Sequence, residues 1–155
     1  MTATNAARIL KAAGIRFDAR EYDVSDGEIS GVAVAAKIGI EAERVFKTLV
    51  TTGRDTGLNV FVIPCNAELD LKKAARAAGD KNIEMLKARE LEPKTGYVHG
   101  GCSPVGMKKQ FPTFVDETAA LFETIYVSGG RVGLQLGLAP ADLAQITCAA
   151  YRDLF

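Results

Sequence analysis

Lys47 lies in the middle of a run, residues 45–50, whose other members favour a buried strand. Alternation along a strand places Lys47 and Leu49 on one face, with Phe46 and Thr48 on the other. An ammonium group is costly to bury without a partner. The lysine therefore either faces water, which the pattern alone favours, or lines a pocket for an anionic ligand.

A glycine-rich stretch, residues 96–106, contains four glycines and one proline and follows neither a helical nor a strand period. Its spacing matches neither a Walker A loop nor a dinucleotide fingerprint. Consecutive backbone N–H groups at such glycines can bind an anion, or the oxyanion that forms when an ester carbonyl is attacked. A plain connecting loop explains the composition nearly as well.

Two further candidates for chemistry, His99 and Cys102, lie in the same stretch. His99 is the single histidine and could act as a base beside Cys102 or Ser103, but a lone histidine is more often structural or exposed. A reactive thiol needs a nearby base or positive charge, and the sequence guarantees none at Cys102. We therefore favour a packing role for Cys102 and a structural or merely exposed position for His99.

The cysteine content argues against a metal site. Cys65, Cys102 and Cys148 are far apart and form no CxxC pair, and one histidine cannot complete a four-ligand zinc site. We expect no metal, no cofactor and three free thiols, as is usual in a reducing compartment.

The charge balance limits the classes of partner. The chain has 19 basic and 19 acidic residues, whereas a protein that grips long nucleic acid normally carries a basic surplus. We therefore expect neither DNA binding nor a dedicated tRNA grip. No apolar stretch approaches the roughly 20 residues of a membrane span, and residues 1–5 do not resemble a signal peptide. We expect a cytoplasmic protein without membrane contact.

The periodicity predicts a mixture of helices and strands without regular βαβ alternation. The composition, 48% hydrophobic and 25% charged, is that of an ordinary globular protein, and 155 residues suit one domain spanning 1–155. Hairpins are expected at 53–57 and at Gly129-Gly130. We predict an α+β fold, with a curved, mostly antiparallel sheet and helices packed around it. The expected helices are 4–13, 30–38, 71–78, 87–91 and one from Pro140 that includes Ala150; the expected strands are 15–24, 44–52, 58–64, 113–115, 124–127 and 132–138.

Several short motifs occur in an order that is more specific than any one of them. They are residues 20–23 (REYD), 44–49 (RVFKTL), 71–75 (LKKAA), 95–97 (TGY), 100–106 (GGCSPVG) with Lys108-Lys109, and 122–130 (FETIYVSGG). In this order the chain resembles the YbaK/EbsC family, whose relatives include the editing insertion domain of bacterial prolyl-tRNA synthetases. The resemblance covers nearly the whole chain, from Ile9 to the final helix.

The resemblance implies a mixed sheet or partial barrel with surrounding helices, acting as a free-standing aminoacyl-tRNA deacylase. Its substrate would be cysteine misattached to proline tRNA, bound by the acceptor end, with prolyl-tRNA synthetase as an expected transient partner. By position, Lys47 matches the family's active-site lysine, expected near the acceptor end and its phosphate. Residues 100–104 match its GxxxP loop. The residues expected to contact substrate are Tyr22, Phe46, Thr48, Ser103, Pro104 and Ser128.

The implied chemistry needs no catalytic triad, because the cysteinyl thiol of the substrate can attack its own ester. Holding the side chain bent toward the ester replaces much of the work of an enzyme nucleophile. Backbone N–H groups of Gly100 and Gly101 would stabilise the oxyanion. Cys102 and His99 would then be dispensable.

Three departures from the family pattern lie near the expected pocket. The family commonly has an aliphatic residue where Cys102 stands, His99 is outside its motif, and residues 23–28 differ from the histidine-containing version of close relatives. Two alternatives therefore stay open. One is deacylation of Ala-tRNA(Pro) or another mischarged tRNA, and the other is a non-catalytic domain that binds nucleotides, RNA ends or a protein.

Overall fold

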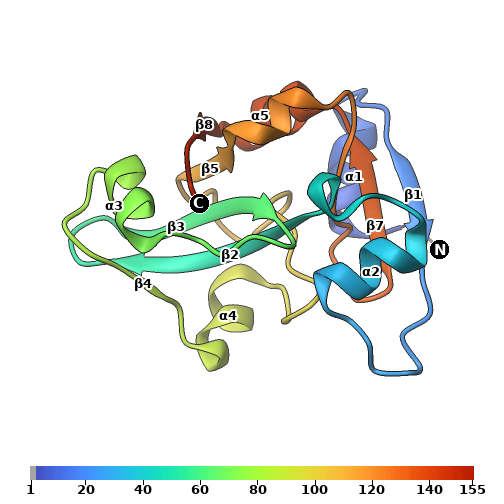
Figure 1. Cartoon of the computed structure of the whole chain (residues 1–155), viewed down its shortest axis with the longest axis horizontal. Helices are drawn as coiled ribbons and strands as arrows, with labels where there is room; N and C mark the ends of the chain where they lie inside the picture. The colour runs from blue at the N-terminus through green and yellow to red at the C-terminus, as the bar shows by residue number, and fades with distance from the viewer. Residues whose placement is uncertain (1–2) are drawn as a thin grey trace.

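The chain folds into helices arranged around two β-sheets (Figure 1), and the computed structural model describes residues 3–155. The predicted α+β class is confirmed. In chain order the elements are α1 (Asn5–Ala12), β1 (Asp18–Glu21), α2 (Gly31–Ile38), η1 (Ala42–Arg44), β2 (Phe46–Gly53), β3 (Gly57–Pro64), α3 (Leu71–Ala78), β4 (Ile83–Met85), α4 (Ala88–Thr95), β5 (Thr113–Asp116), η2 (Glu117–Leu121), β6 (Ile125–Ser128), β7 (Leu134–Leu138), α5 (Pro140–Thr147) and β8 (Ala150–Arg152).

The strands form one three-stranded sheet, β1-β7-β6, and one five-stranded sheet, β4-β2-β3-β5-β8. Most pairings are antiparallel, as predicted, and the parallel ones join β3 to β5 and β5 to β8. An isolated bridge between Val45 and Tyr126 joins the two sheets where β2 begins. Neither sheet closes into a barrel within residues 3–155, because each strand order has two ends.

The hairpin β2–β3 is the longest paired unit and crosses much of the molecule (Figure 1). β3 is central, and its side chains alternate between two apolar clusters. Val60 and Val62 pack into the main core, whereas Phe61 and Ile63 pack into a second cluster beneath α3. Burial on both faces explains why this strand is apolar at every one of these positions.

The helix ends predicted from local signals are confirmed at α2 and α3. Ser30 accepts a hydrogen bond from the Ala33 N–H, and α2 ends at Gly39 with φ +73°. Asp70 caps α3 in the same way, and Gly79 ends it with φ +68°. Both helices begin at an oxygen-bearing side chain and end at a glycine in the left-handed region.

The prediction that a helix would end before Pro93 was wrong. α4 continues through Pro93 to Thr95, where the Gly96 N–H donates to the Glu92 carbonyl at 2.8 Å and the Thr95 hydroxyl to the Leu91 carbonyl at 2.7 Å. A proline removes one backbone donor, and the neighbouring hydrogen bonds carry the helix past it.

The expectation that the final helix includes Ala150 was also wrong. α5 ends at Thr147, and Cys148 turns the chain with φ +54° into β8, which pairs with β5. The following Leu154 is fully buried, and its N–H donates to the Asp116 carboxylate at 2.9 Å. None of the helices within residues 3–155 has the length and apolar character that a membrane crossing requires.

Candidate functional site

A cavity of about 210 Å³ lies where the start of β2, the loop after α4 and the segment entering α2 meet. Lys47 and Gly100 both line it, so the strand-borne lysine and the glycine-rich loop face one space. Pockets that enclose a drug-sized ligand usually measure about 300–1,000 Å³. This cavity is therefore suited to one end of a larger molecule.

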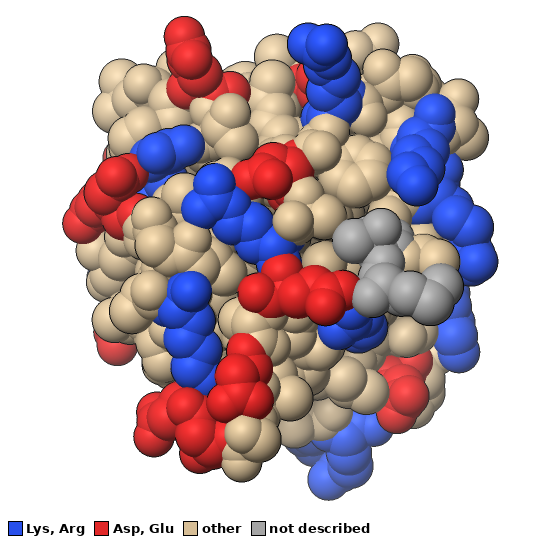
Figure 2. All heavy atoms as spheres, turned by 90° about the vertical axis from the view of Figure 1, so that its right-hand side faces the viewer, with Lys and Arg blue, Asp and Glu red and all other residues tan. Residues whose placement is uncertain are grey.

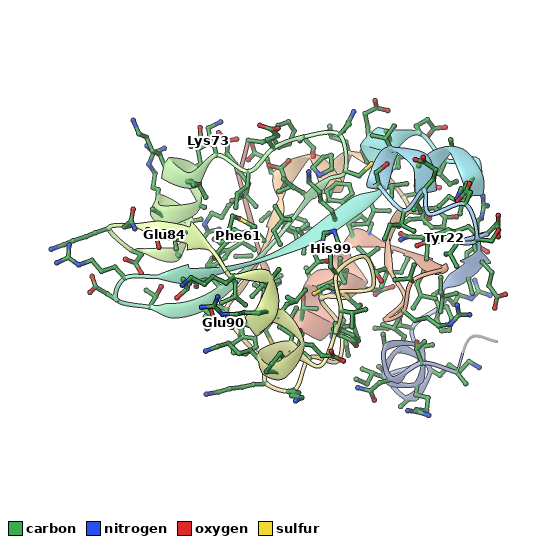
Figure 3. All side chains as sticks on the ribbon, turned by 90° about the horizontal axis from the view of Figure 1, so that it is seen from below. Tyr22, Phe61, Lys73, Glu84, Glu90 and His99 are labelled. Atoms are coloured by element: carbon green, nitrogen blue, oxygen red, sulfur yellow. The ribbon has the colours of Figure 1, made fainter. Side chains whose placement is uncertain are left out.

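Most of the residues that the sequence nominated for a site meet at this cavity. Lys47, Gly100 and four of the expected substrate contacts line it: Tyr22, Phe46, Thr48 and Ser128. Figure 3 labels Tyr22, just after β1, and His99, which is also in the lining and comes from the loop after α4.

Three nominated residues of the glycine-rich loop are not among the cavity lining: Gly101, Ser103 and Pro104. Ser103 is fully buried, and its hydroxyl oxygen accepts the Val105 N–H at 3.1 Å. Pro104 lines a second pocket, between α1, α5 and the loop. The structure thus places these residues behind the wall that Gly100 contributes to.

Gly100 belongs to a β-turn of residues 98–101. The Gly101 N–H donates to the Val98 carbonyl at 3.0 Å, and Gly100, in the third position, has φ +83°. That conformation is the one a type II turn requires and favours glycine. A Cβ atom on Gly101 would lie about 3.0 Å from the Val132 backbone nitrogen, so the loop packs directly on the β6–β7 connection. Glycine is therefore favoured at position 100 by the backbone conformation and at position 101 by the close packing.

Lys47 is half-buried on β2, in the part of this strand that pairs with β3 but not with β4. β4 pairs with β2 from Thr51 onward, which leaves the Lys47 region without a partner strand on that edge. No carboxylate within residues 3–155 lies at ion-pair distance from its ammonium group. A cation in this position attracts an anionic ligand at the cavity.

Two residues of the lining each carry a side-chain oxygen that is buried and lacks any hydrogen-bond partner among the described residues. These oxygens are Oγ1 of Thr48 and Oε1 of Gln135. Buried polar atoms are almost always paired, and the exceptions often mark a binding site. Each can accept a hydrogen bond from a donor that reaches it.

Sequence reasoning missed Gln135. It stands opposite Ser128 in the β6–β7 register and is 7% exposed. Its neighbours Leu134 and Leu136 point into the main core on the other face of the strand. The available signal was a single amide in an otherwise apolar strand.

The start of α2 was also missed as part of the site. Ile29, Ser30, Gly31 and Val34 line the cavity, and Ile29 lies beside Gly100 of the glycine-rich loop. A Cβ atom on Gly31 would lie 2.4 Å from the Cβ of Cys65, so glycine is what allows α2 to approach the end of β3. The signal was a glycine directly after the capping serine.

The two thiols in the lining are poor nucleophiles. Burial raises the pKa of Cys102 to about 12, and burial also raises the pKa of Cys65 despite the nearby charge of Lys47. Both thiols are thus protonated at neutral pH. The lining contains no Asp or Glu, and His99 is exposed. The lining therefore contains the cation of Lys47 but no carboxylate and no thiol with a lowered pKa.

Metal binding finds no support in the described residues. Within 3–155, no three side chains of His, Cys, Asp or Glu gather closely enough to hold an ion.

Comparison with known families gives one match over most of the chain. The profile described as "Aminoacyl-tRNA editing domain" matches residues 30–146. Of the elements that line the cavity, this range includes α2, β2, the glycine-rich loop and β7.

Curated relatives and a solved structure agree with this profile. EbsC of Enterococcus faecalis, put forward by name as a Cys-tRNA(Pro)/Cys-tRNA(Cys) deacylase, is 46% identical over 97% of this chain and 92% of that protein. A proline–tRNA ligase of Shouchella clausii is 30% identical over 77% of this chain, which spans only 21% of the ligase. A crystal structure of a protein put forward as a trans-editing enzyme for prolyl tRNA synthetase superposes with a TM-score of 0.88, at 25% identity, over 99% of this chain and 96% of that chain.

Proposed function

The chain belongs to the aminoacyl-tRNA editing domain family, and from this membership we propose that it is a deacylase that releases cysteine misattached to proline tRNA. The observation that carries the proposal is the shared cavity of Lys47 and Gly100, whose lining holds unpaired acceptors but no activated nucleophile. Such a site suits a substrate that brings its own reactive group.

The acceptor end of the tRNA binds with its terminal phosphate near Lys47. The aminoacyl group enters the cavity, where Thr48 and Gln135 accept hydrogen bonds from its donors, the α-ammonium group first among them. The oxygens are buried, so a donor supplied by the substrate removes the cost of leaving them unpaired.

The cysteinyl thiol then attacks its own ester. Sulfur bonds to the carbonyl carbon, the bond from that carbon to the ribose oxygen breaks, and the thiol proton ends on the ribose hydroxyl. The tRNA leaves uncharged, and the amino acid leaves as a cyclic thioester. Because the attack is intramolecular, holding the side chain bent toward the ester removes a large part of the activation free energy.

The oxyanion on the ester carbonyl binds at the glycine-rich turn. Gly100 lines the cavity and supplies its N–H to the oxyanion. Gly101 contributes by fixing the turn, because its own N–H donates to the Val98 carbonyl.

A mechanism with water as nucleophile has less support. Activating water needs a general base, and the lining contains no carboxylate. A thiol-dependent reaction also discriminates chemically against alanine, because alanine has no thiol. A pocket that fits cysteine cannot exclude the smaller alanine by size.

Prolyl-tRNA synthetase is the partner that we propose to supply tRNA affinity. The chain has no net charge, and Figure 2 shows acidic and basic side chains interspersed over the face that it presents. A free-standing editing protein of this kind gains by docking on the enzyme that already holds the tRNA, because tethering raises the effective concentration.

The test is deacylation of a panel of charged tRNAs: Cys-tRNA(Pro), Ala-tRNA(Pro) and Cys-tRNA(Cys). We expect the purified protein to release cysteine from tRNA(Pro) and to leave alanine in place. Lys47→Ala should lower kcat/KM by roughly 100-fold or more. Cys102→Ala, His99→Ala and the surface control Lys72→Ala should retain most of the activity.

Each opposite result has a distinct meaning. Release of alanine without cysteine overturns the choice of amino acid. A folded but inactive Cys102→Ala protein overturns the substrate-thiol mechanism. Binding of acceptor-stem mimics without release from any charged tRNA shows a binding domain in place of an enzyme.

A further inference from the structure

Residues 23–28 form a loop between two residues of the cavity lining, Tyr22 and Ile29. The loop thus connects two parts of the cavity wall, and Tyr22 is in addition held by its N–H, which donates to the Gly133 carbonyl at 3.0 Å. The loop is exposed, and Val24 keeps 42% of its surface accessible. Little apolar burial holds it in place.

One side chain outside the loop ties it to the body of the protein. The ammonium group of Lys37, in the last turn of α2, donates to the Asp23 carbonyl at 2.7 Å, the Asp26 carboxylate at 2.8 Å and the Glu28 carbonyl at 2.9 Å. These three bonds use all three donors of the ammonium group.

The remaining hydrogen bonds of the loop stay within it. In the described part of the chain, residues 23–28 otherwise bond only to one another, as when the Gly27 N–H donates to Val24 or the Ser25 hydroxyl to Asp23. The loop is a small internally bonded unit, and Lys37 is its polar link to α2.

α2 is itself part of the cavity. Its first turn supplies Ser30, Gly31 and Val34 to the lining, and Lys37 extends from its other end. A clamp from this helix to the loop therefore makes two walls of the cavity move as one. We propose that Lys37 is a positioning residue that, by holding residues 23–28, fixes Tyr22 and Ile29 and so sets the size of the amino acid that the cavity accepts.

This inference rests on the proposed function and adds a determinant of its specificity. Lys37 touches no substrate. Methionine keeps the length of the side chain and its packing but loses the three donors, so Lys37→Met frees the loop. An arginine cannot replace the clamp fully, because its planar fork does not match three acceptors arranged around one nitrogen.

The sharpest probe compares two amino acids with the same chemistry and different size. Homocysteine carries a thiol and one more methylene than cysteine, so its ring closure forms five members where that of cysteine forms four. This intrinsic difference cancels when the homocysteine-to-cysteine ratio of a variant is compared with that of the wild type, and the change in the ratio then reports pocket size. One methylene in a tight pocket is worth roughly 10–200-fold in discrimination. Release of the loop should relax that discrimination.

The experiment measures kcat and KM on Cys-tRNA(Pro) and Hcy-tRNA(Pro), with hydrogen exchange of the loop amides. Lys37→Met should raise KM for Cys-tRNA(Pro) by about tenfold with kcat within about twofold, because ground-state and transition-state binding weaken together. The ratio of kcat/KM for homocysteine to that for cysteine should rise at least about fivefold. The Gly27 amide should exchange faster.

Lys11→Met is the matched control, since Lys11 also lies in the last turn of an eight-residue helix, α1. It should change none of these quantities. A folded Lys37→Met protein whose homocysteine-to-cysteine ratio stays at the wild-type value overturns the inference. If Lys37→Met does not fold, Asp26→Asn weakens the same clamp and must shift the ratio in the same direction. A wild-type protein that releases no amino acid fails the proposed function instead, and the exchange of Gly27 in Lys37→Met still tests the clamp.

Discussion

Thr48 on β2 and Gln135 on β7 come from two different sheets and line one cavity, and each carries a buried side-chain oxygen without a hydrogen-bond partner among the described residues. Each oxygen lowers the stability of the ligand-free protein, because burial removes water without supplying a protein donor. That cost disappears when a ligand donates to it. If donors of the substrate bind to this pair, as we propose, mutation of either residue should change substrate binding and stability in opposite directions.

Thr48→Val tests this opposition on the β2 side. Valine keeps the shape and the branched Cβ but removes the orphan hydroxyl, so unfolding free energy should rise by up to about 1 kcal/mol. KM for the charged tRNA should rise by roughly fivefold, because a hydrogen bond to the substrate is lost. Thermal unfolding and steady-state deacylation measure the two effects.

Thr51→Val is the control on the same strand. The Thr51 hydroxyl is buried and donates to the Asn59 carbonyl at 2.9 Å, so its removal should lower stability by about 1 kcal/mol and leave KM unchanged. If both valine variants lose stability alike, the Thr48 oxygen is not an orphan in solution.

Gln135→Met makes the corresponding test on β7. The side chain keeps its length and loses the unpaired amide, so the melting temperature should rise by about 2–4 °C for each kcal/mol gained. Deacylation should fall by about tenfold or more, since the acceptor for the substrate is gone. Gln110→Met serves as comparison, because the Gln110 amide donates to the Thr147 carbonyl away from the cavity. A Gln135→Met protein with wild-type kinetics would exclude this residue from the site.

Gly100→Ala separates backbone strain from catalysis. Alanine at φ +83° costs about 1–2 kcal/mol, and its Cβ would lie 3.1 Å from Ile29 Cδ1 in the cavity wall. Gly14→Ala carries the same kind of strain at φ +72° with nothing within 4 Å. We expect similar losses of stability in urea unfolding, and a loss of activity for Gly100→Ala alone. Equal activity in the two variants would remove the turn from the mechanism.

Alkaline pH should destabilise the fold through Cys102 and Tyr97. Burial raises the pKa of Cys102 from 9.0 to about 12, and burial together with the neighbouring Cys102 raises that of Tyr97 from 10.0 to about 12. Below pH 9 both groups are protonated in the folded and the unfolded chain. Between their ordinary values and pH 12 the unfolded chain loses these protons first, so stability falls as pH rises, by about 1.4 kcal/mol per unit for each group.

Urea unfolding from pH 8 to pH 11 measures this slope. Cys102→Ala should flatten it, because the variant has no thiol to ionise in the unfolded state. An unchanged slope in both Cys102→Ala and Tyr97→Phe would show that neither group stays protonated in the fold.

The sequence predicted best those features that depend on neighbours along the chain. Ser30 and Gly39 delimit α2 because a side-chain oxygen and a left-handed glycine act within a few residues. β8 escaped prediction because its three residues are stabilised only by β5, far earlier in the chain. At Pro93 the local rule that a proline ends a helix failed, because the surrounding hydrogen bonds carry α4 on to Thr95.

The site divides in the same way. Family resemblance nominated Lys47, Gly100 and Ser128 because they lie in recognisable motifs, and all three line the cavity. Gln135 carries no such motif, and its orphan oxygen exists only because two sheets and α2 enclose one space. Periodicity shows which face of β7 is polar, but it does not show that nothing on that face pairs with the amide.

The cavity is assembled from segments that a ribosome delivers at widely separated moments. β1, which leads into Tyr22, can pair only after β7 has been made, because Asp18 pairs with Gly137. Until β7 has been made, β1 lacks its partner strand and the cavity lacks the part of its wall that contains Gln135. A chain that ends before β7 therefore lacks part of the cavity wall, and we expect such a chain to lose deacylation.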